Sequence, residues 1–299
     1  MRECGSYGRY GVQVFFVISG FVIPFALARS CYQLSDYGRF IAKRIVRLDP
    51  PYFVSIAFVV MVGYTLAHLS FLDSRDYTVS IPQLLAHLAY LNVFLDYPWL
   101  IPVFWTLAIE FQYYLLMGLV FPVISARAAW LRWLGLISLA ALAMIPVESE
   151  KWVFRWLFVF LGGIAAFNYR TCTTRKPEFF FTLILAGAGA TWINGAMVGS
   201  IVTATALSLA FLNVKPVPPL LFLGSISYGL YLLHVPIGTR VLNFSLHFTL
   251  GWPGKLFVFS LAAALSIAGA FLLHRWVEAP AQKWSARLPY RHRKYTRGS

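Results

Sequence analysis

The chain has 299 residues, of which 59% are hydrophobic and only 12% are charged, and its formal net charge is +14. Soluble domains carry about 25% charged residues, so this composition excludes an ordinary soluble globular protein and indicates a membrane protein. Alternating polar and apolar segments of about ten residues do not dominate, which argues against an outer-membrane barrel.

Nine apolar segments near the length that a bilayer requires follow one another along the chain. They are residues 11–28, 52–72, 103–125, 133–147, 152–168, 179–195, 197–213, 219–243 and 256–274. A weaker stretch, Gln83 to Leu95, is short and contains His87 and Asn92, which indicates an interfacial or re-entrant piece. We therefore predict an all-α, polytopic membrane bundle of about nine helices over residues 1–280, followed by a basic cytoplasmic tail, residues 281–299.

The distribution of cationic residues gives an orientation. If the spans alternate and the C-terminus is cytoplasmic, 18 of the 25 lysines and arginines lie on the cytoplasmic side. This is the positive-inside pattern of inner-membrane proteins, so the net charge indicates topology and attraction to anionic lipid rather than nucleic-acid binding. The short tail Met1 to Tyr10 would then lie outside although it carries Arg2 and Arg9, which leads us to expect one more helix upstream.

The three cysteines, Cys4, Cys31 and Cys172, are scattered and show no metal-ligand spacing. No dinucleotide, haem or zinc motif accompanies them. We expect no metal and no bound cofactor.

Candidate site residues are the polar groups within the spans, since such groups are costly there and often functional. In FWTLAIEFQYY, residues 104–114, Glu110 is the only carboxylate deep in a span, and Thr106, Glu110, Tyr113 and Met117 share one helical face. Glu110 could be a structural residue that holds helices together, or a site residue that orients a base or binds a sugar hydroxyl.

A second polar stripe lies in GSISYGLYLLHVP, residues 224–236. Gly224, Ser227, Tyr231 and His234 follow one another at 3, 4, 3 spacing, and Pro236 deprives the carbonyl of Leu232 of its helical partner. His234 could act as a general base or simply be satisfied within the bundle. His234 and Glu110 both fall in the outer halves of their spans.

Two further groups lie at cytoplasmic helix ends. Arg44 and Arg47 are three residues apart and suit phosphate oxygens, either of coenzyme A or of lipid headgroups. In RWVEAP, residues 275–280, the proline is expected to stop the helix and Glu278 to pair with nearby arginines, a structural role.

These segments together resemble the membrane acyltransferase 3 family, whose members O-acylate bacterial surface sugars. GVQVFFVISGF resembles its G-V-x-x-F-F-V-x-S-G-F signature, and KRIVRLDPPYF its R-R-x-x-R-x-x-P-x-Y loop. FWTLAIEFQYYLL, SISYGLYLLHVP and VEAP resemble its W-S-L-x-x-E-x-x-F/Y-Y-L, S-Y-x-x-Y-L-x-H and closing E-x-P motifs. The five motifs occur in the family's order between residues 11 and 280.

The resemblance implies transfer of an acyl group, with acetyl expected, from cytoplasmic acyl-CoA as co-substrate to a hydroxyl of a carbohydrate or lipid-linked glycan at the bacterial inner membrane. It implies that His234 and Glu110 are catalytic and that donor and substrate are bound by Arg44, Arg47, Trp105, Tyr113, Tyr228 and Tyr231. Ser19 and Gly20 would let helices approach closely. The acceptor, the acyl length and the oligomeric state stay open.

Two alternatives remain. The family is described with ten spans, and its first span carries an Arg and a His ten residues apart that no segment before Gly11 supplies. The chain could therefore be a truncated or degenerate member that does not catalyse. It could also be a transporter that uses Glu110 and His234 as a proton relay.

Overall fold

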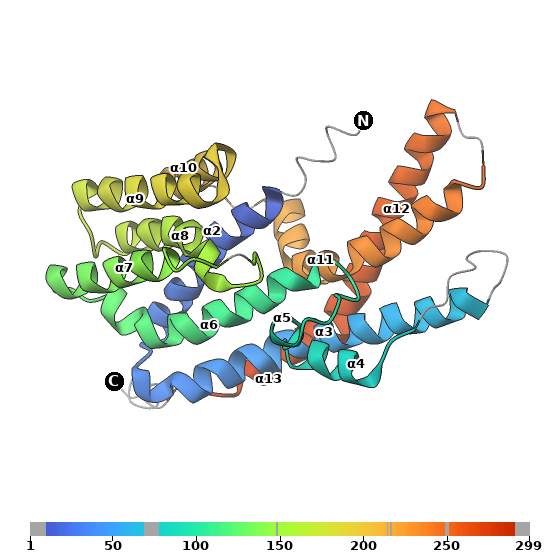
Figure 1. Cartoon of the computed structure of the whole chain (residues 1–299), viewed down its shortest axis with the longest axis horizontal. Helices are drawn as coiled ribbons and strands as arrows, with labels where there is room; N and C mark the ends of the chain where they lie inside the picture. Colours follow the sequence, from blue (N-terminus) through green and yellow to red (C-terminus); the bar gives the residue numbers. More distant parts are fainter. Residues whose placement is uncertain are drawn as a thin grey trace. The chain divides into compact units, whose positions relative to one another are not determined.

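In the computed structural model, which describes residues 10–68, 78–147, 149–213, 215, 217–248 and 251–290, every regular element is helical. Each of the nine apolar segments forms a helix (Figure 1), so the all-α class is confirmed. These helices are α2 (Gly11–Arg29), α3 (Tyr37–His68), α6 (Phe104–Ile124), α7 (Ala129–Ala143), α8 (Leu157–Arg170), α9 (Lys176–Asn194), α10 (Ala196–Phe211), α11 (Pro218–Ser245) and α12 (Trp252–Leu273).

Five helices of the described chain are long and apolar enough to cross a bilayer: α2, α3, α6, α11 and α12. The weaker stretch around His87 forms two short helices, α4 (Ile81–Leu88) and α5 (Asn92–Leu95), of 8 and 4 residues. A span needs about 20 residues, so neither crosses a bilayer.

The chain divides into two compact units, which we describe separately. The first unit comprises residues 1–41, 108–214 and 289–299, and the second comprises residues 42–107 and 215–288. The basic residues Arg291 to Arg297 and the segment Met1 to Arg9 lie outside the described residues.

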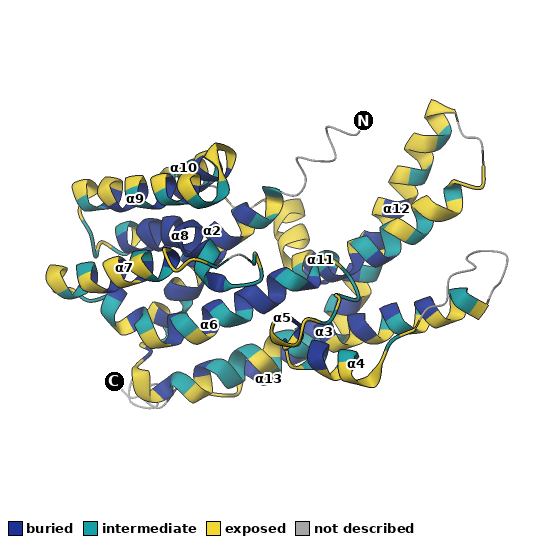
Figure 2. Cartoon of the chain, viewed as in Figure 1, coloured by how far each residue is buried: buried dark blue, intermediate teal, exposed yellow. Residues whose placement is uncertain are grey.

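In the first unit α8 is the central helix, and every residue from Leu157 to Asn168 is buried (Figure 2). Helices α2, α7, α9 and α10 pack against it. A helix that is apolar on all sides is stable only inside a core, which is the position that α8 occupies.

The contact between α2 and α8 depends on two glycines. A Cβ atom on Gly20 would overlap the carbonyl oxygen of Phe160, and one on Gly163 would overlap the carbonyl oxygen of Val17. Small residues let two membrane helices approach until their backbones touch. Gly20 therefore permits the close approach, while its neighbour Ser19 makes the polar contact described below.

Three hydrogen bonds define the relative directions of α2, α6 and α8. Ser19 of α2 bonds to Glu110 of α6, and Tyr32, just after α2, bonds to the carbonyl oxygen of Gly118, further along α6. Tyr113 of α6 stacks on Phe160 of α8, and further along both helices Asn168 of α8 donates to the carbonyl oxygen of Ile124. The three helices run parallel, as alternating crossings require.

In the second unit α11 and α12 pack antiparallel, with Gly229 against the backbone of Ala270. The sequence predicted a second span that starts at residue 52. The corresponding helix, α3, already begins at Tyr37 and continues through Pro50 and Pro51. At 1.5 Å per residue its 32 residues extend about 48 Å, more than the roughly 30 Å hydrocarbon core. Arg44 and Arg47 therefore lie within the first third of α3, before its apolar stretch.

The expectation that Pro280 stops the last helix was wrong. A π-helical turn over His274–Glu278 follows α12, and α13 (Ala279–Ala286) continues from it. Proline is tolerated in the first turn of a helix because the N–H that it lacks has no helical partner there. The π turn places Pro280 in that position.

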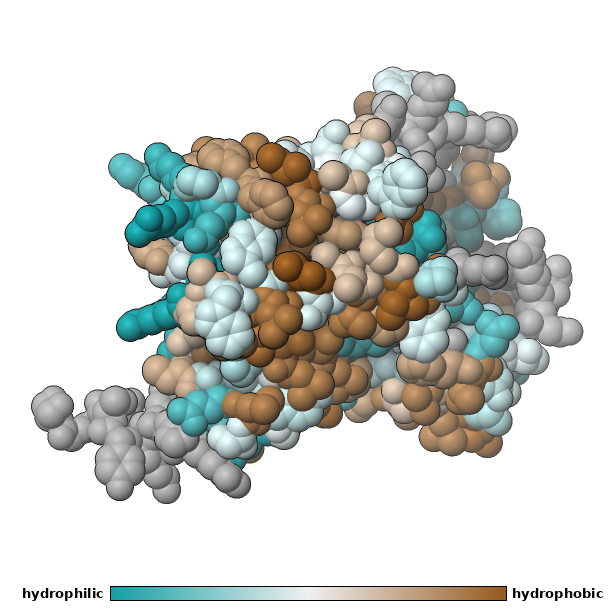
Figure 3. Space-filling view, turned by 60° about the vertical axis from the view of Figure 1, so that its left-hand side comes forward, coloured by the Kyte–Doolittle hydropathy of each residue, from teal (hydrophilic) through white to brown (hydrophobic). Residues whose placement is uncertain are grey.

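Large apolar side chains cover much of the surface in Figure 3, with hydrophilic groups along its margins. Phe257 and Phe259 of α12, for example, are 68% and 66% exposed. Such a surface would drive aggregation in water, whereas in a bilayer these side chains face lipid.

Candidate functional site

His234 lies on α11 with its two ring nitrogens in different environments. Its Nδ1 is 3.0 Å from the carbonyl oxygen of Leu230 and 2.9 Å from that of Tyr231. Carbonyl oxygens only accept hydrogen bonds, so Nδ1 carries the proton and Nε2 of the neutral ring holds a lone pair. Nε2 has no hydrogen-bond partner among the described residues.

A pocket of about 670 Å³ lies beside this imidazole, between α11 and α12. Ser227, Tyr231 and His234, three of the four residues of the polar stripe, line it. The opposite wall, on α12, consists of Phe259, Ala262, Ala263, Ser266 and Ile267. The pocket thus combines an almost entirely apolar surface with one available imidazole nitrogen. Pro236 does not interrupt the α11 wall of the pocket, because the helix continues through it to Ser245.

The two motif tyrosines of α11 use their hydroxyl groups to hold helices together. Tyr228 donates to the carbonyl oxygen of Leu48 in α3 at 2.9 Å. Tyr231 donates to the carbonyl oxygen of Val103 at 2.9 Å and also contacts the hydroxyl of Thr106 in the first turn of α6. The ring of Tyr231 forms part of the pocket wall, so this residue joins the pocket to α6.

Glu110 belongs to the first unit, where it is 7% exposed. One of its carboxylate oxygens, Oε1, accepts a hydrogen bond from Tyr114 at 2.5 Å and one from Ser19 at 3.3 Å. Ser19 was expected only to ease helix packing, yet its hydroxyl contacts the candidate carboxylate. Two donors on one oxygen fix the orientation of the carboxylate.

Tyr113 is fully buried in the first unit, with its ring stacked on Phe160 at a centroid distance of 3.8 Å. Its hydroxyl has no hydrogen-bond partner within the described part of the chain. A buried hydroxyl without a partner is costly, which makes Tyr113 a position where a bound group could supply one.

The other sequence candidates belong to the second unit. Arg47 is exposed and Arg44 half-buried on α3, and Trp105 is half-buried in the first turn of α6. Nearby, Lys43 donates from Nζ to the carbonyl oxygen of Leu288, and Ser285 donates to the carbonyl oxygen of Lys43. The end of α13 therefore packs against the part of α3 that carries the arginines.

The sequence predicts an arginine partner for Glu278, but among the described residues its partners are a histidine and a glutamine. Glu278 accepts hydrogen bonds from His274 Nδ1 at 3.1 Å and from Gln282 Nε2 at 3.0 Å. The three side chains are four residues apart, so each lies one turn from the next on the same helix face. Glu278 stabilises the passage from α12 through the π turn to α13.

Sequence reasoning missed a buried polar cluster around α4. His87 is completely buried, with Nδ1 donating to the carbonyl oxygen of Gln83 at 2.8 Å and Nε2 accepting from the backbone N–H of Leu100 at 3.0 Å. Tyr90, which has a positive φ of 57°, donates to Asp49 at 3.0 Å and stacks on Tyr52. These contacts join segments distant in sequence, and only the position of His87 in an apolar stretch hinted at them.

Both ring nitrogens of His87 bind backbone groups, so this histidine has no lone pair or N–H left for a substrate. Burial lowers the pKa of His87, while its hydrogen bond to Gln83 raises it by a smaller amount. His87 therefore fixes the segment that leads into α6. His234, unlike His87, lines the pocket between α11 and α12.

No group of three or more metal-ligating side chains occurs in the part of the chain that the structure describes. Comparison with known families gives a match over residues 5–275 to the model of the acyltransferase 3 family, described as an acyltransferase domain. The chain belongs to this family. The match spans the helices that carry Glu110, His234, Arg44 and Arg47.

Three kinds of curated protein are also similar to this chain. The O-acetyltransferase OatA of Staphylococcus aureus (strain NCTC 8325 / PS 47) is 27% identical over 93% of this chain and 53% of its own length. Acyltransferase MdmB of Streptomyces mycarofaciens is 27% identical over 93% of this chain and 82% of its own. Nodulation protein 10 of Rhizobium leguminosarum bv. viciae is 25% identical over 91% and 82%.

The chain thus spans about half the length of the OatA relatives and most of the length of the other two. No solved structure matches it.

Proposed function

We propose that this protein is an integral-membrane O-acyltransferase that moves an acyl group, with acetyl expected, from acyl-CoA to a hydroxyl of a cell-surface or secreted carbohydrate. Family membership supports the reaction class. The observation that carries the mechanism is the free Nε2 lone pair of His234 at an apolar pocket. A neutral imidazole there can remove a proton from a hydroxyl.

The proposed reaction needs a single base, His234, which takes one proton and gives it back. His234 Nε2 takes the proton of the acceptor hydroxyl while the hydroxyl oxygen attacks the thioester carbonyl carbon. The bond from that carbon to sulfur then breaks, and the coenzyme A thiolate takes the proton from the imidazolium. The bonds from Nδ1 to the carbonyl oxygens of Leu230 and Tyr231 stabilise the imidazolium and keep the ring in place.

Glu110 is proposed as the second catalytic residue, because its carboxylate is buried and oriented by Ser19 and Tyr114. In this role it binds a hydroxyl of the sugar or orients a base. Tyr113, with its unpaired hydroxyl, and Trp105 would contribute to substrate binding.

Arg44 and Arg47 are proposed to bind the phosphates of acyl-CoA, since guanidinium groups pair with phosphate oxygens in two-pronged hydrogen bonds. The exposed position of Arg47 on α3 suits this role. We place the protein in the bacterial inner membrane with its C-terminus in the cytoplasm, where acyl-CoA is made. The charge distribution supports this orientation.

The test is incorporation of labelled acetyl from acetyl-CoA into glycan by membranes that contain this chain, compared with the variant His234→Gln. We expect the variant to lose about 100-fold in rate, the lower end of what a general base contributes. His247→Gln, an exposed histidine outside the pocket, is the matched control and should retain activity.

The outcomes separate the alternatives. Full activity of His234→Gln would remove His234 from the mechanism. A well-folded chain that binds acyl-CoA and transfers nothing would favour a non-catalytic family member. Proton-coupled uptake without acyl-CoA binding would favour the transporter.

A further inference from the structure

One end of the first unit gathers cationic side chains that the proposed reaction does not use. Two segments, residues 125–134 and 168–178, form the turns from α6 to α7 and from α8 to α9. Between them they carry a single carboxylate, that of Glu178, and five cations. The cations are Arg127, Arg132, Arg170, Arg175 and Lys176.

Arg132 holds these two turns together. Its side chain is buried, and one guanidinium nitrogen donates to the carbonyl oxygen of Ala126 at 2.9 Å. The other nitrogen forms an ion pair with Glu178, in the first turn of α9, at 2.5 Å. The turn that carries Arg127 therefore lies next to the start of α9. Because Arg132 and Glu178 neutralise each other, the net charge of this end comes from the other four cations.

Three of those four cations have no internal partner. Arg170 donates to the side chain of Asn213 at 2.8 Å. The side chains of Arg127, Arg175 and Lys176 are exposed and form no hydrogen bond or ion pair within the described part of the chain. This end of the unit therefore presents three positive charges that an anion from outside can neutralise.

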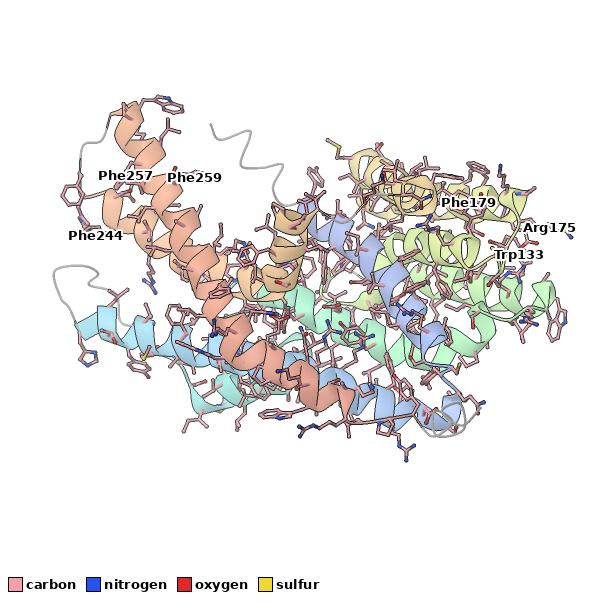
Figure 4. All side chains as sticks on the ribbon, turned by 180° about the vertical axis from the view of Figure 1, so that it is seen from behind. Trp133, Arg175, Phe179, Phe244, Phe257 and Phe259 are labelled. Atoms are coloured by element: carbon pink, nitrogen blue, oxygen red, sulfur yellow. The ribbon has the colours of Figure 1, made fainter. Side chains whose placement is uncertain are left out.

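The surface beside these cations becomes apolar one turn into the helices. Trp133 of α7 and Phe181 of α9 meet edge to face with their ring centroids 5.3 Å apart, and Phe181 is 61% exposed. One turn further along, Ile137 of α7 and Ile184 of α9 are both exposed. Figure 4 shows Trp133 and Arg175 at the same end of the unit. Along both helices the order is thus cation, aromatic ring, aliphatic side chain.

That order matches a phospholipid lying against the two helices. Basic residues between membrane helices bind anionic headgroups, tryptophan is enriched at the level of the headgroups, and aliphatic side chains contact acyl chains. A soluble phosphate compound such as coenzyme A would use the three charges and leave the rings and the aliphatic surface without a partner. The apolar surface that adjoins the charges therefore favours a lipid.

We propose that the adjoining ends of α7 and α9 bind an anionic phospholipid. Its phosphate is held by the three unpaired cations, and one acyl chain runs past the aromatic pair and the two isoleucines. The lipid connects α7 to α9 on the outside of the unit, as the buried ion pair connects them inside. This site contains none of the residues proposed for acyl transfer.

Photolabelling tests the proposal with the full chain in phosphatidylcholine nanodiscs. The probe is a small fraction of phosphatidylglycerol with a diazirine in one acyl chain, and adducts are located by mass spectrometry. We expect saturable labelling of residues 133–137 and 181–184. Replacing part of the phosphatidylcholine by unlabelled phosphatidylglycerol should suppress this labelling, and soluble coenzyme A should leave it unchanged.

Two double variants separate this site from general attraction to charge. Arg175→Gln/Lys176→Gln should lower labelling at sub-saturating probe about 25-fold, because each basic residue near anionic lipid contributes about fivefold in affinity. Lys283→Gln/Arg287→Gln removes two exposed cations from the second unit and should leave this labelling unchanged. Arg175→Lys keeps the charge and should also keep the labelling. Melting temperatures show whether each variant is folded.

Three results would overturn the proposal. The first is equal labelling of these residues in the two double variants. The second is displacement of the probe by coenzyme A, which would assign the three charges to a soluble phosphate. The third is equal labelling by a phosphatidylcholine probe with the same acyl chains, which would show contact with bulk lipid and no selection of the headgroup. None of these readouts requires acetyl transfer, so failure of the proposed function would leave this site in place.

Discussion

Two substitutions of Glu110 distinguish its structural role from its chemical role, because the hydrogen-bond partners of its carboxylate are known. Its Oε1 atom accepts hydrogen bonds from Ser19 and Tyr114 inside the first unit. Glutamine keeps a carbonyl oxygen that can accept both bonds but carries no negative charge. Leucine fills similar space and leaves the two hydroxyl groups without a partner.

We expect Glu110→Leu to destabilise the protein by about 2–4 kcal/mol, because two buried donors lose their acceptor. Glu110→Gln should change stability by less than about 1 kcal/mol and still reduce acetyl transfer if the charge is needed. Thermal unfolding in detergent and the transfer assay measure the two effects. Equal loss of stability in both variants would contradict the structural account, and full activity of Glu110→Gln would remove the charge from the mechanism.

His87 illustrates a buried titratable group that binds no substrate. Its pKa is lowered by burial, so the folded protein binds fewer protons than the unfolded chain near and below the unfolded pKa of about 6.5. Its contribution to stability is therefore complete above that pH and is lost as the pH falls through it.

We expect the apparent melting temperature to fall between pH 7.5 and pH 5, and this fall to be smaller in His87→Asn, which has no imidazole to protonate. His68→Asn, an exposed histidine at the end of α3, should leave the slope unchanged. An identical pH slope in the wild type and His87→Asn would show that protonation of His87 does not govern this stability.

At the scale of elements, helix pairs in both units meet at small residues. Gly20 and Gly163 allow α2 and α8 to touch, and Gly229 lies against Ala270 where α11 meets α12. Because lipid provides little hydrophobic force between helices, close packing supplies much of their association. A methyl group added at such a crossing would overlap backbone atoms and force the two helices apart.

Gly163→Ala should therefore lower stability by about 1–3 kcal/mol or prevent folding, since its methyl group meets the backbone of Val17, which cannot rotate away. Gly38→Ala, where the new methyl meets no atom within 4 Å, should be neutral or slightly stabilising, because alanine favours helix. The melting temperatures of Gly163→Ala and Gly38→Ala, measured by thermal unfolding, test this prediction. Equal melting temperatures would contradict the importance of this crossing.

At the scale of the whole molecule, the order of the helices and the charges between them define a topology. Helices α2 and α8 run parallel, so Cys31 after α2 and Cys172 after α8 emerge at the same end of the first unit. Both cysteines are free and exposed. The positive-inside rule predicts that this end lies in the cytoplasm, as we propose.

In a Cys4→Ser background, a membrane-impermeant maleimide should label Cys31 and Cys172 in inside-out vesicles and leave them unlabelled in right-side-out vesicles. A cysteine introduced as Ser149→Cys, between α7 and α8, should show the opposite pattern. Labelling of Cys31 and Cys172 from opposite sides would contradict the alternating topology.

Much of the fold follows from composition and periodicity, because a bilayer admits helices of a limited length. The nine apolar segments became nine helices, most with ends within a few residues of the expected ones. The errors were at prolines. Pro50 and Pro51 lie inside α3, and Pro280 lies in the first turn of α13 after a π turn, where the missing N–H has no helical partner.

The sequence by itself determined the membrane class, the helices and the residue types in the motifs, because these depend on local hydropathy and order along the chain. Only the tertiary structure showed which polar groups are already satisfied. It gave Glu278 a histidine partner, engaged both nitrogens of His87, and left Nε2 of the pocket-lining His234 without a hydrogen-bond partner among the described residues. Several local pairs would have been possible for each side chain, and for His87 the second partner, the N–H of Leu100, lies in another segment, so the assignment requires the packed structure.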